Sequence, residues 1–170
     1  MWKILLFLMI VVVLGCFGLI LSGNLKQRRK EIDSFLFGLR MIESEIQYET
    51  AELSVCFQRA GNALNGVLRD LFYDTAERIR ESGNGEQAFL CSLQEHREDL
   101  AFTEKDMESI KRFANGLGEK DLEQVLKDLN FLKERMKDSL VEAAKNEEKY
   151  GKLFLHTGWL TGICMALICI

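Results

Sequence analysis

Residues 31–48 read EIDSFLFGLRMIESEIQY, a stretch in which apolar side chains recur at regular intervals among polar ones. The large apolar side chains recur at steps of three and four residues, which is the spacing of one face of an α-helix. They are Ile32, Phe35, Leu36, Leu39, Ile42 and Ile46. The stretch therefore predicts an amphipathic helix whose apolar face packs against other elements.

The same spacing continues through the centre of the chain, interrupted by short polar and glycine-containing turns. Further amphipathic segments are predicted at residues 51–60, 67–79, 89–100, 104–115 and from about residue 119 onward. No stretch has the strict alternation that is typical of a half-buried β-strand. The pattern predicts an all-α fold, a bundle of six helices.

Two local signals predict where one of these helices begins and ends. Thr103 precedes acidic residues at positions 104 and 106, which is the arrangement of a hydroxyl N-cap. Gly116 is expected to end the helix in the left-handed conformation that favours glycine. A side chain at Gly116 is therefore expected to cost more stability than one at Gly85, which lies in the predicted loop at residues 82–85.

Charged residues are confined to the centre of the chain. All 26 acidic residues and all but one of the 22 basic residues lie in the region 24–152, which is therefore acidic. Residues 4–21 and 153–170 are apolar runs without Asp, Glu, Lys or Arg, each about 27 Å long as a helix. We expect residues 1–23 and 153–170 to form N- and C-terminal transmembrane helices that flank a bundle at residues 24–152.

The first apolar run has two other interpretations. A cleaved signal peptide is one of them, because a short positive start precedes the run, but no A-x-A-like site follows it before the basic cluster. A lipoprotein signal is the other, because residues 13–16 read VLGC and loosely resemble a lipobox. The residues after Cys16 remain apolar, however, where a mature lipoprotein should become polar.

Flanking charge predicts how the chain is oriented in the membrane. The basic cluster that follows the first run consists of Lys26, Arg28, Arg29 and Lys30. The second run is preceded by three lysines, whereas only Lys3 lies on the other side of either run. By the positive-inside rule this asymmetry places the bundle in the cytoplasm. The basic cluster is a topology signal in this interpretation, and attraction to anionic lipid is its alternative role.

The central region has no motif that indicates catalysis, a metal or a cofactor. His96 is its only histidine, and Cys56 and Cys91 occur singly in apolar helical surroundings, where core positions are expected. An odd total of 5 cysteines argues against a disulfide framework. The acidic balance, without a basic or aromatic stripe, argues against nucleic-acid binding. We expect a protein that is not an enzyme and needs no cofactor.

Small residues in the second predicted span indicate a role in helix packing. Gly158, Gly162 and Ala166 are spaced four residues apart and therefore share one helix face. Such spacing allows two membrane helices to approach closely. The partner would be the first span or a helix of another protein.

Three segments have a recognisable order: LRMIESEIQYETAEL at 39–53, FANGLG at 113–118 with Asp121 three residues later, and EKYGK at 148–152. Together with the two apolar runs, they resemble the stage III sporulation protein AB family of endospore-forming bacteria. The resemblance extends over nearly the whole chain. One departure is that the family usually has Thr-Pro-Leu after the tyrosine motif, where residues 50–53 here read TAEL.

The resemblance implies a role in the machinery that is built between mother cell and forespore. The family looks like a reduced relative of the inner-membrane platform subunit of type II secretion and type IV pilus systems, whose cytoplasmic domains are six-helix bundles. It implies a non-enzymatic subunit of a trans-envelope secretion or channel complex, located in the mother-cell membrane around the forespore.

The partners that the resemblance implies are other proteins of the stage III sporulation A operon. They include the cytoplasmic secretion-type ATPase and multi-span membrane subunits, and an oligomer of the chain itself stays open. The alternative hypothesis comes from a different class: a membrane-anchored enzyme or sensor whose site is too dispersed for a motif to reveal.

Overall fold

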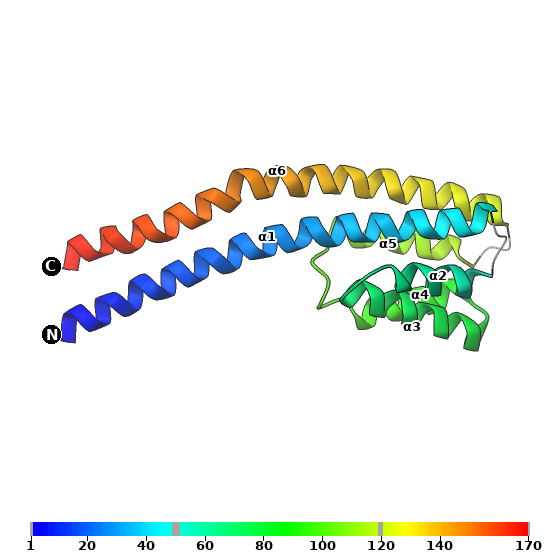
Figure 1. Ribbon diagram of the computed structural model, residues 1–170, viewed down its shortest axis with the longest axis horizontal. Helices are drawn as coiled ribbons and strands as arrows, with labels where there is room; N and C mark the ends of the chain where they lie inside the picture. Colours follow the sequence, from blue (N-terminus) through cyan, green and yellow to red (C-terminus); the bar gives the residue numbers. More distant parts are fainter. Residues whose placement is uncertain (1, 49–51, 119–120, 170) are drawn as a thin grey trace. The chain divides into compact units, whose positions relative to one another are not determined.

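The computed structural model describes the backbone of residues 2–48, 52–118 and 121–169, and the side chains of residues 22–48, 52–118, 121 and 123–150. Within this described backbone the fold is all-α, with six helices and no strand, as the sequence predicted (Figure 1). The helices are α1 (Trp2–Tyr48), α2 (Leu53–Asn62), α3 (Val67–Ser82), α4 (Gly85–Glu95), α5 (Glu104–Gly116) and α6 (Leu122–Cys169).

The chain divides into two compact units. The larger unit, Lys30–Leu140, contains α2 to α5 and the adjoining parts of α1 and α6. The other unit consists of the two ends, Met1–Arg29 and Val141–Ile170. Within this second unit an ion pair links α1 to α6, because Arg29 Nη1 and Glu147 Oε2 are 3.0 Å apart.

The predicted apolar face of α1 forms a large part of the core of the Lys30–Leu140 unit. All six of its large apolar side chains in the stretch 31–48 are at most 4% exposed. Removing such a side chain from water stabilises the fold by about 1.5–3 kcal/mol, which far exceeds differences in helix propensity. Burial of this face, more than local propensity, therefore holds this part of α1 in place.

A continuous chain of six phenylalanine rings runs through this core. Neighbouring ring centroids are between 5.3 Å and 6.1 Å apart, in tilted or edge-to-face geometry that suits aromatic pairs. In order of contact the rings are Phe102, Phe35, Phe72, Phe57, Phe89 and Phe113. The chain of rings thus connects α1 with α3, α2, α4 and α5 in turn.

The short helices pack one on the next in chain order, α2 on α3, α3 on α4 and α4 on α5. Figure 1 shows α2, α3 and α4 gathered together. The loop predicted at residues 82–85 separates α3 from α4, with Gly83 at φ +67° and the Asn84 side chain accepting a hydrogen bond from Gln87 N. Gly85 is already the first residue of α4.

Asp106 combines a helix cap with a buried link between two helices. Its backbone N–H donates to Thr103 Oγ1, and its Oδ2 accepts from Thr103 N at 2.9 Å, so the predicted N-cap is confirmed as a full capping box. Its other oxygen, Oδ1, accepts a 2.5 Å hydrogen bond from Ser139 Oγ on α6. Since Asp106 is only 1% exposed, these bonds replace the water that its carboxylate has lost.

The prediction that Gly116 adopts a left-handed conformation is wrong. Gly116 is the last residue of α5, and Leu117 follows it with a right-handed φ of −71°. The Leu117 N–H donates to Ala114 O at 3.0 Å, so the helix ends in a tighter right-handed turn that needs no positive φ. Among the described residues the glycines with positive φ are Gly66 and Gly83.

Among the residues whose side chains are described, no helix is long and apolar enough to span a membrane. The predicted spans at residues 4–21 and 153–170 lie outside those residues, although their backbone belongs to α1 and α6. The two-span arrangement and the boundaries 1–23, 24–152 and 153–170 therefore stay predictions.

Candidate functional site

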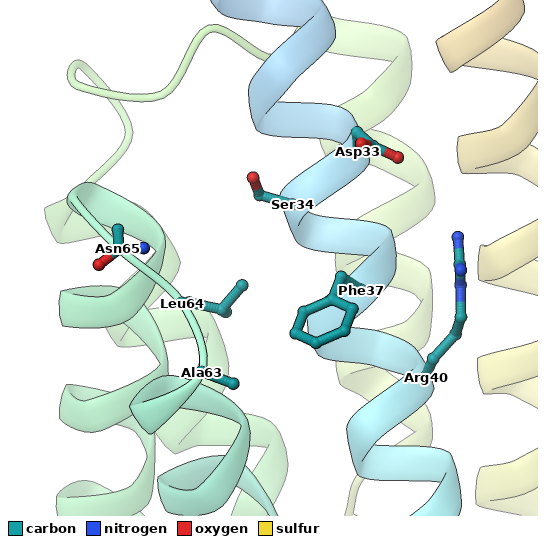
Figure 2. A pocket seen from close by; sticks show the side chains of 7 residues that line it. All are labelled: Asp33, Ser34, Phe37, Arg40, Ala63, Leu64 and Asn65. Atoms are coloured by element: carbon teal, nitrogen blue, oxygen red, sulfur yellow. The ribbon is translucent and has the colours of Figure 1, made fainter.

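A groove on the Lys30–Leu140 unit is the candidate functional site (Figure 2). It opens between α1 and the segment that joins α2 to α3, and its volume is about 330 Å³. This volume is at the lower end of the range for ligand pockets and fits a few side chains. The lining residues are Asp33, Ser34, Phe37 and Arg40 from α1, and Ala63, Leu64 and Asn65 from the joining segment.

Two glycines allow the backbone to build this groove. A Cβ atom on Gly38 would lie 3.0 Å from Leu64 Cδ1 and 3.1 Å from the Phe72 ring, so a hydrogen atom is what fits between α1 and its neighbours. Gly66 has φ +64°, a conformation that L side chains rarely adopt, and it forms the N-cap position of α3. The two glycines thus fix the distance and direction of the segment that faces α1.

Phe37 is an aromatic side chain on the exposed side of α1. The preceding residues Phe35 and Leu36 are buried, whereas Phe37 is 46% exposed. In Figure 2 its ring lies between Leu64 and Ala63 on one side and Arg40 on the other. Sequence analysis did not single out Phe37. The signal in the sequence was an aromatic residue one position away from the buried stripe, where the helix should present polar groups to water.

Asp33 and Arg40 supply opposite charges along the same face of α1. They lie four residues before and three residues after Phe37, so the helical repeat brings all three to one side. Neither charge has an ion pair or hydrogen bond within the described part of the chain. Nearby charges on the same helix do have partners, since Glu43 pairs with Lys133 and Glu45 with Arg59.

Elsewhere in the described part of this unit, the side chains that could bind a metal or take part in catalysis are dispersed. No three or more His, Cys, Asp or Glu side chains among the described residues are placed to hold a metal ion. His96 Nε2 and Asp74 Oδ2 are 2.7 Å apart, so this isolated histidine has a structural partner. The prediction of a core position is confirmed for Cys56, which is buried, and wrong for Cys91, which is exposed on α4.

The surface of the unit carries paired charges, of which Glu134 and Lys137 on α6 are an example. The Lys137 ammonium, by its hydrogen bond and by its charge, lowers the pKa of Glu134 below its ordinary value. This pair is three residues apart on α6 and faces solvent, where such pairs add little stability. It belongs to a solvated helix face rather than to an acid–base site.

Two groups of predicted site residues lie toward the ends of the chain, and the structure describes the side chains of one group only. In the basic cluster, Lys26, Arg29 and Lys30 are exposed and Arg28 is half-buried. The packing strip predicted from Gly158, Gly162 and Ala166 belongs to α6 but lies outside the residues whose side chains are described. A role for either group therefore stays a prediction.

Comparison with known proteins supplies the identity. The family model of stage III sporulation protein AB matches residues 3–170. The chain belongs to the stage III sporulation protein AB family. This membership confirms the resemblance inferred from the ordered segments. The helical bundle is therefore part of a protein of a sporulation family.

One solved structure, of stage III sporulation protein AB, has the same fold as this family member. It is 21% identical in sequence, with a TM-score of 0.68, and the match covers 72% of this chain and 98% of that chain. Among curated proteins no significant match was found.

Proposed function

We propose that this chain is a non-enzymatic, membrane-anchored subunit of the sporulation complex between mother cell and forespore. Its helical bundle docks a protein partner, such as the secretion-type ATPase. The observation that supports the proposal most is the family match, which extends from residue 3 to residue 170 and so includes both apolar ends. In this proposal residues 1–23 and 153–170 span the mother-cell membrane around the forespore, and residues 24–152 lie in the cytoplasm.

The character of the groove supports docking as the role of the bundle. It combines an exposed aromatic ring with two charges that have no ion pair among the described residues, and it is carried by a helix whose opposite face is buried. A surface of this kind holds its geometry before a partner arrives, so that little conformational entropy is lost on binding.

The orientation can be tested with reporters inserted at residues 82–85. Gly83 and Asn84 are exposed there, so an insertion should leave the flanking helices intact. We expect a reporter that is active only in the cytoplasm to work at this position, and one that is active only outside to be inactive. The opposite pair of results would reject the charge argument and favour a cleaved signal peptide.

A second prediction concerns the small residues of the second proposed span. Lipid solvates Leu and Ile well, so apolarity alone gives a span no reason to select a partner, whereas a strip of small residues permits close backbone contact. Gly162→Leu is therefore expected to leave the amount of protein in the membrane unchanged but to reduce spore formation or recovery of the complex.

Thr161→Leu is the control, because it places the same leucine side chain at the neighbouring position outside the strip. It should reduce spore formation less than Gly162→Leu does. Normal sporulation of both variants would mean that the second span is an anchor without a packing role.

A further inference from the structure

We infer that the α1 face formed by Asp33, Phe37 and Arg40, together with the groove beside it, is the surface on which the bundle binds one amphipathic α-helix of a partner protein. This helix would place an apolar side chain against Phe37, a carboxylate against Arg40 and a basic group against Asp33. The inference rests on the proposed function, because it names the docking face and the chemistry of the partner.

The exposed face is long enough for a helix. It continues beyond Arg40 through Ser44 to Tyr48, which is 82% exposed, and all these residues recur at steps of three and four along α1. From Asp33 to Tyr48 the face extends over about 22 Å, or four helical turns. Phe37, one turn from the start of this face, and Tyr48 at its end provide the aromatic anchors that helix-in-groove recognition uses.

The backbone of this surface also favours a helical partner. The lining residues on one side belong to α1, whose backbone N–H and C=O groups are already bonded within the helix. An extended peptide that binds by strand addition would find no edge strand in the described part of the chain. A helix satisfies its backbone internally and brings side chains alone to the contact.

The charges distinguish such a partner from a second copy of this chain. In a parallel pair of α1 segments, Arg40 would oppose Arg40 and Asp33 would oppose Asp33, and both contacts are repulsive. An antiparallel pair would join opposite charges, but it would place the Lys30 ends of the two copies at opposite ends of the interface. The proposed function requires both copies to enter one membrane, so a different protein is the better occupant.

The partner helix therefore has a recognisable sequence. Its apolar stripe should be flanked by an acidic and a basic residue about seven positions apart, since this spacing matches two turns of α1. The acid should face the Arg40 end of the groove and the base the Asp33 end.

Cross-linking in sporulating cells tests the inference with the full chain. The photo-cross-linking residue p-benzoylphenylalanine replaces Phe37 in one strain. In a control strain it replaces Phe131, an aromatic side chain of α6 that is 39% exposed and stacks with Arg112 and Arg135. We expect position 37 to cross-link a helical segment with the predicted charge spacing, at a yield well above that of position 131.

Charge reversal then tests the contact itself. Arg40→Glu should lower the cross-link yield from position 37 by about tenfold or more, because it replaces an attraction by a repulsion. Lys111→Glu changes the net charge equally at an exposed position on α5 and should leave the yield unchanged. Reversing the acid in the cross-linked segment should restore the yield in the Arg40→Glu strain.

Three outcomes would overturn the inference: equal yields at positions 37 and 131, a cross-link to a second copy of the chain, or a yield that Arg40→Glu does not change. The proposed function would remain intact after any of these outcomes if the chain is still in the membrane and spore formation still depends on it. A chain that is absent from the membrane or dispensable for spores would instead contradict the proposed function.

Discussion

Replacing Asp106 by alanine is expected to lower the free energy of unfolding by about 3 kcal/mol. The change removes the carboxylate that completes the capping box of α5, and it leaves the Ser139 hydroxyl without its acceptor in a position that is only 6% exposed. Loss of an N-cap interaction costs about 1 kcal/mol, and a buried donor without a partner costs about 1–3 kcal/mol. Urea denaturation of the full chain in detergent, followed by circular dichroism, measures the difference.

Ser139→Ala supplies the control for this measurement. In the Asp106→Ala variant the Ser139 hydroxyl already has no acceptor. Removing that hydroxyl as well should therefore recover part of the lost free energy of unfolding. The double variant is expected to be destabilised by less than the sum of the two single variants. Strict additivity would mean that the 2.5 Å contact between Asp106 and Ser139 contributes nothing to stability.

Gly85→Ala is expected to destabilise the bundle by about 2 kcal/mol, because it forces a methyl group into a filled space. A Cβ atom there would lie 2.8 Å from Leu53 Cδ2 and 2.9 Å from the carbonyl oxygen of Leu117. The second of these is a backbone atom next to α5, so relief requires that α4 and the end of α5 move apart. Thermal denaturation of the full chain in detergent measures the effect.

Gly116→Ala is the matched variant, and it should change the stability by about 0.5 kcal/mol or less. The atom nearest to a Cβ at Gly116 is Asp128 Oδ2, at 2.5 Å, which is the far end of a side chain that can rotate away. The larger loss of stability is thus expected at Gly85, whereas the sequence predicted it at Gly116. A larger loss for Gly116→Ala than for Gly85→Ala would show that the space around Gly85 can adjust.

Features of the fold that depend on neighbouring residues could be predicted from the sequence. The buried face of α1 follows from the helical repeat alone, and the Thr103 cap follows from residues within one turn of it. The error at Cys91 is also local. The apolar surroundings were correct, but Cys91 is two residues from both Phe89 and Leu93, so on a helix it faces away from the buried stripe that contains them.

Features that depend on distant residues could not be predicted. The Asp106–Ser139 bond joins residues 33 positions apart, and the constraint on Gly85 comes from Leu53 of α2 and from Leu117, which follows α5. The groove has the same character, because Phe37 is just an exposed aromatic residue until the segment at Ala63 and Leu64 is known to lie beside it. Helical periodicity tells which face of each helix is buried, but not which helix meets it.

The connected phenylalanine rings have a consequence for internal motion. A ring in a close-packed interior can turn over only when its neighbours briefly yield space. Phe102 and Phe113 are the two ends of this series of rings, and among the described residues each contacts one other ring. Each inner ring, such as Phe72, is held between two. Ring flips of the inner residues therefore require a shared breathing motion of several helices. The core of this bundle should loosen as a unit, with its slowest side-chain dynamics at the centre of the chain of rings.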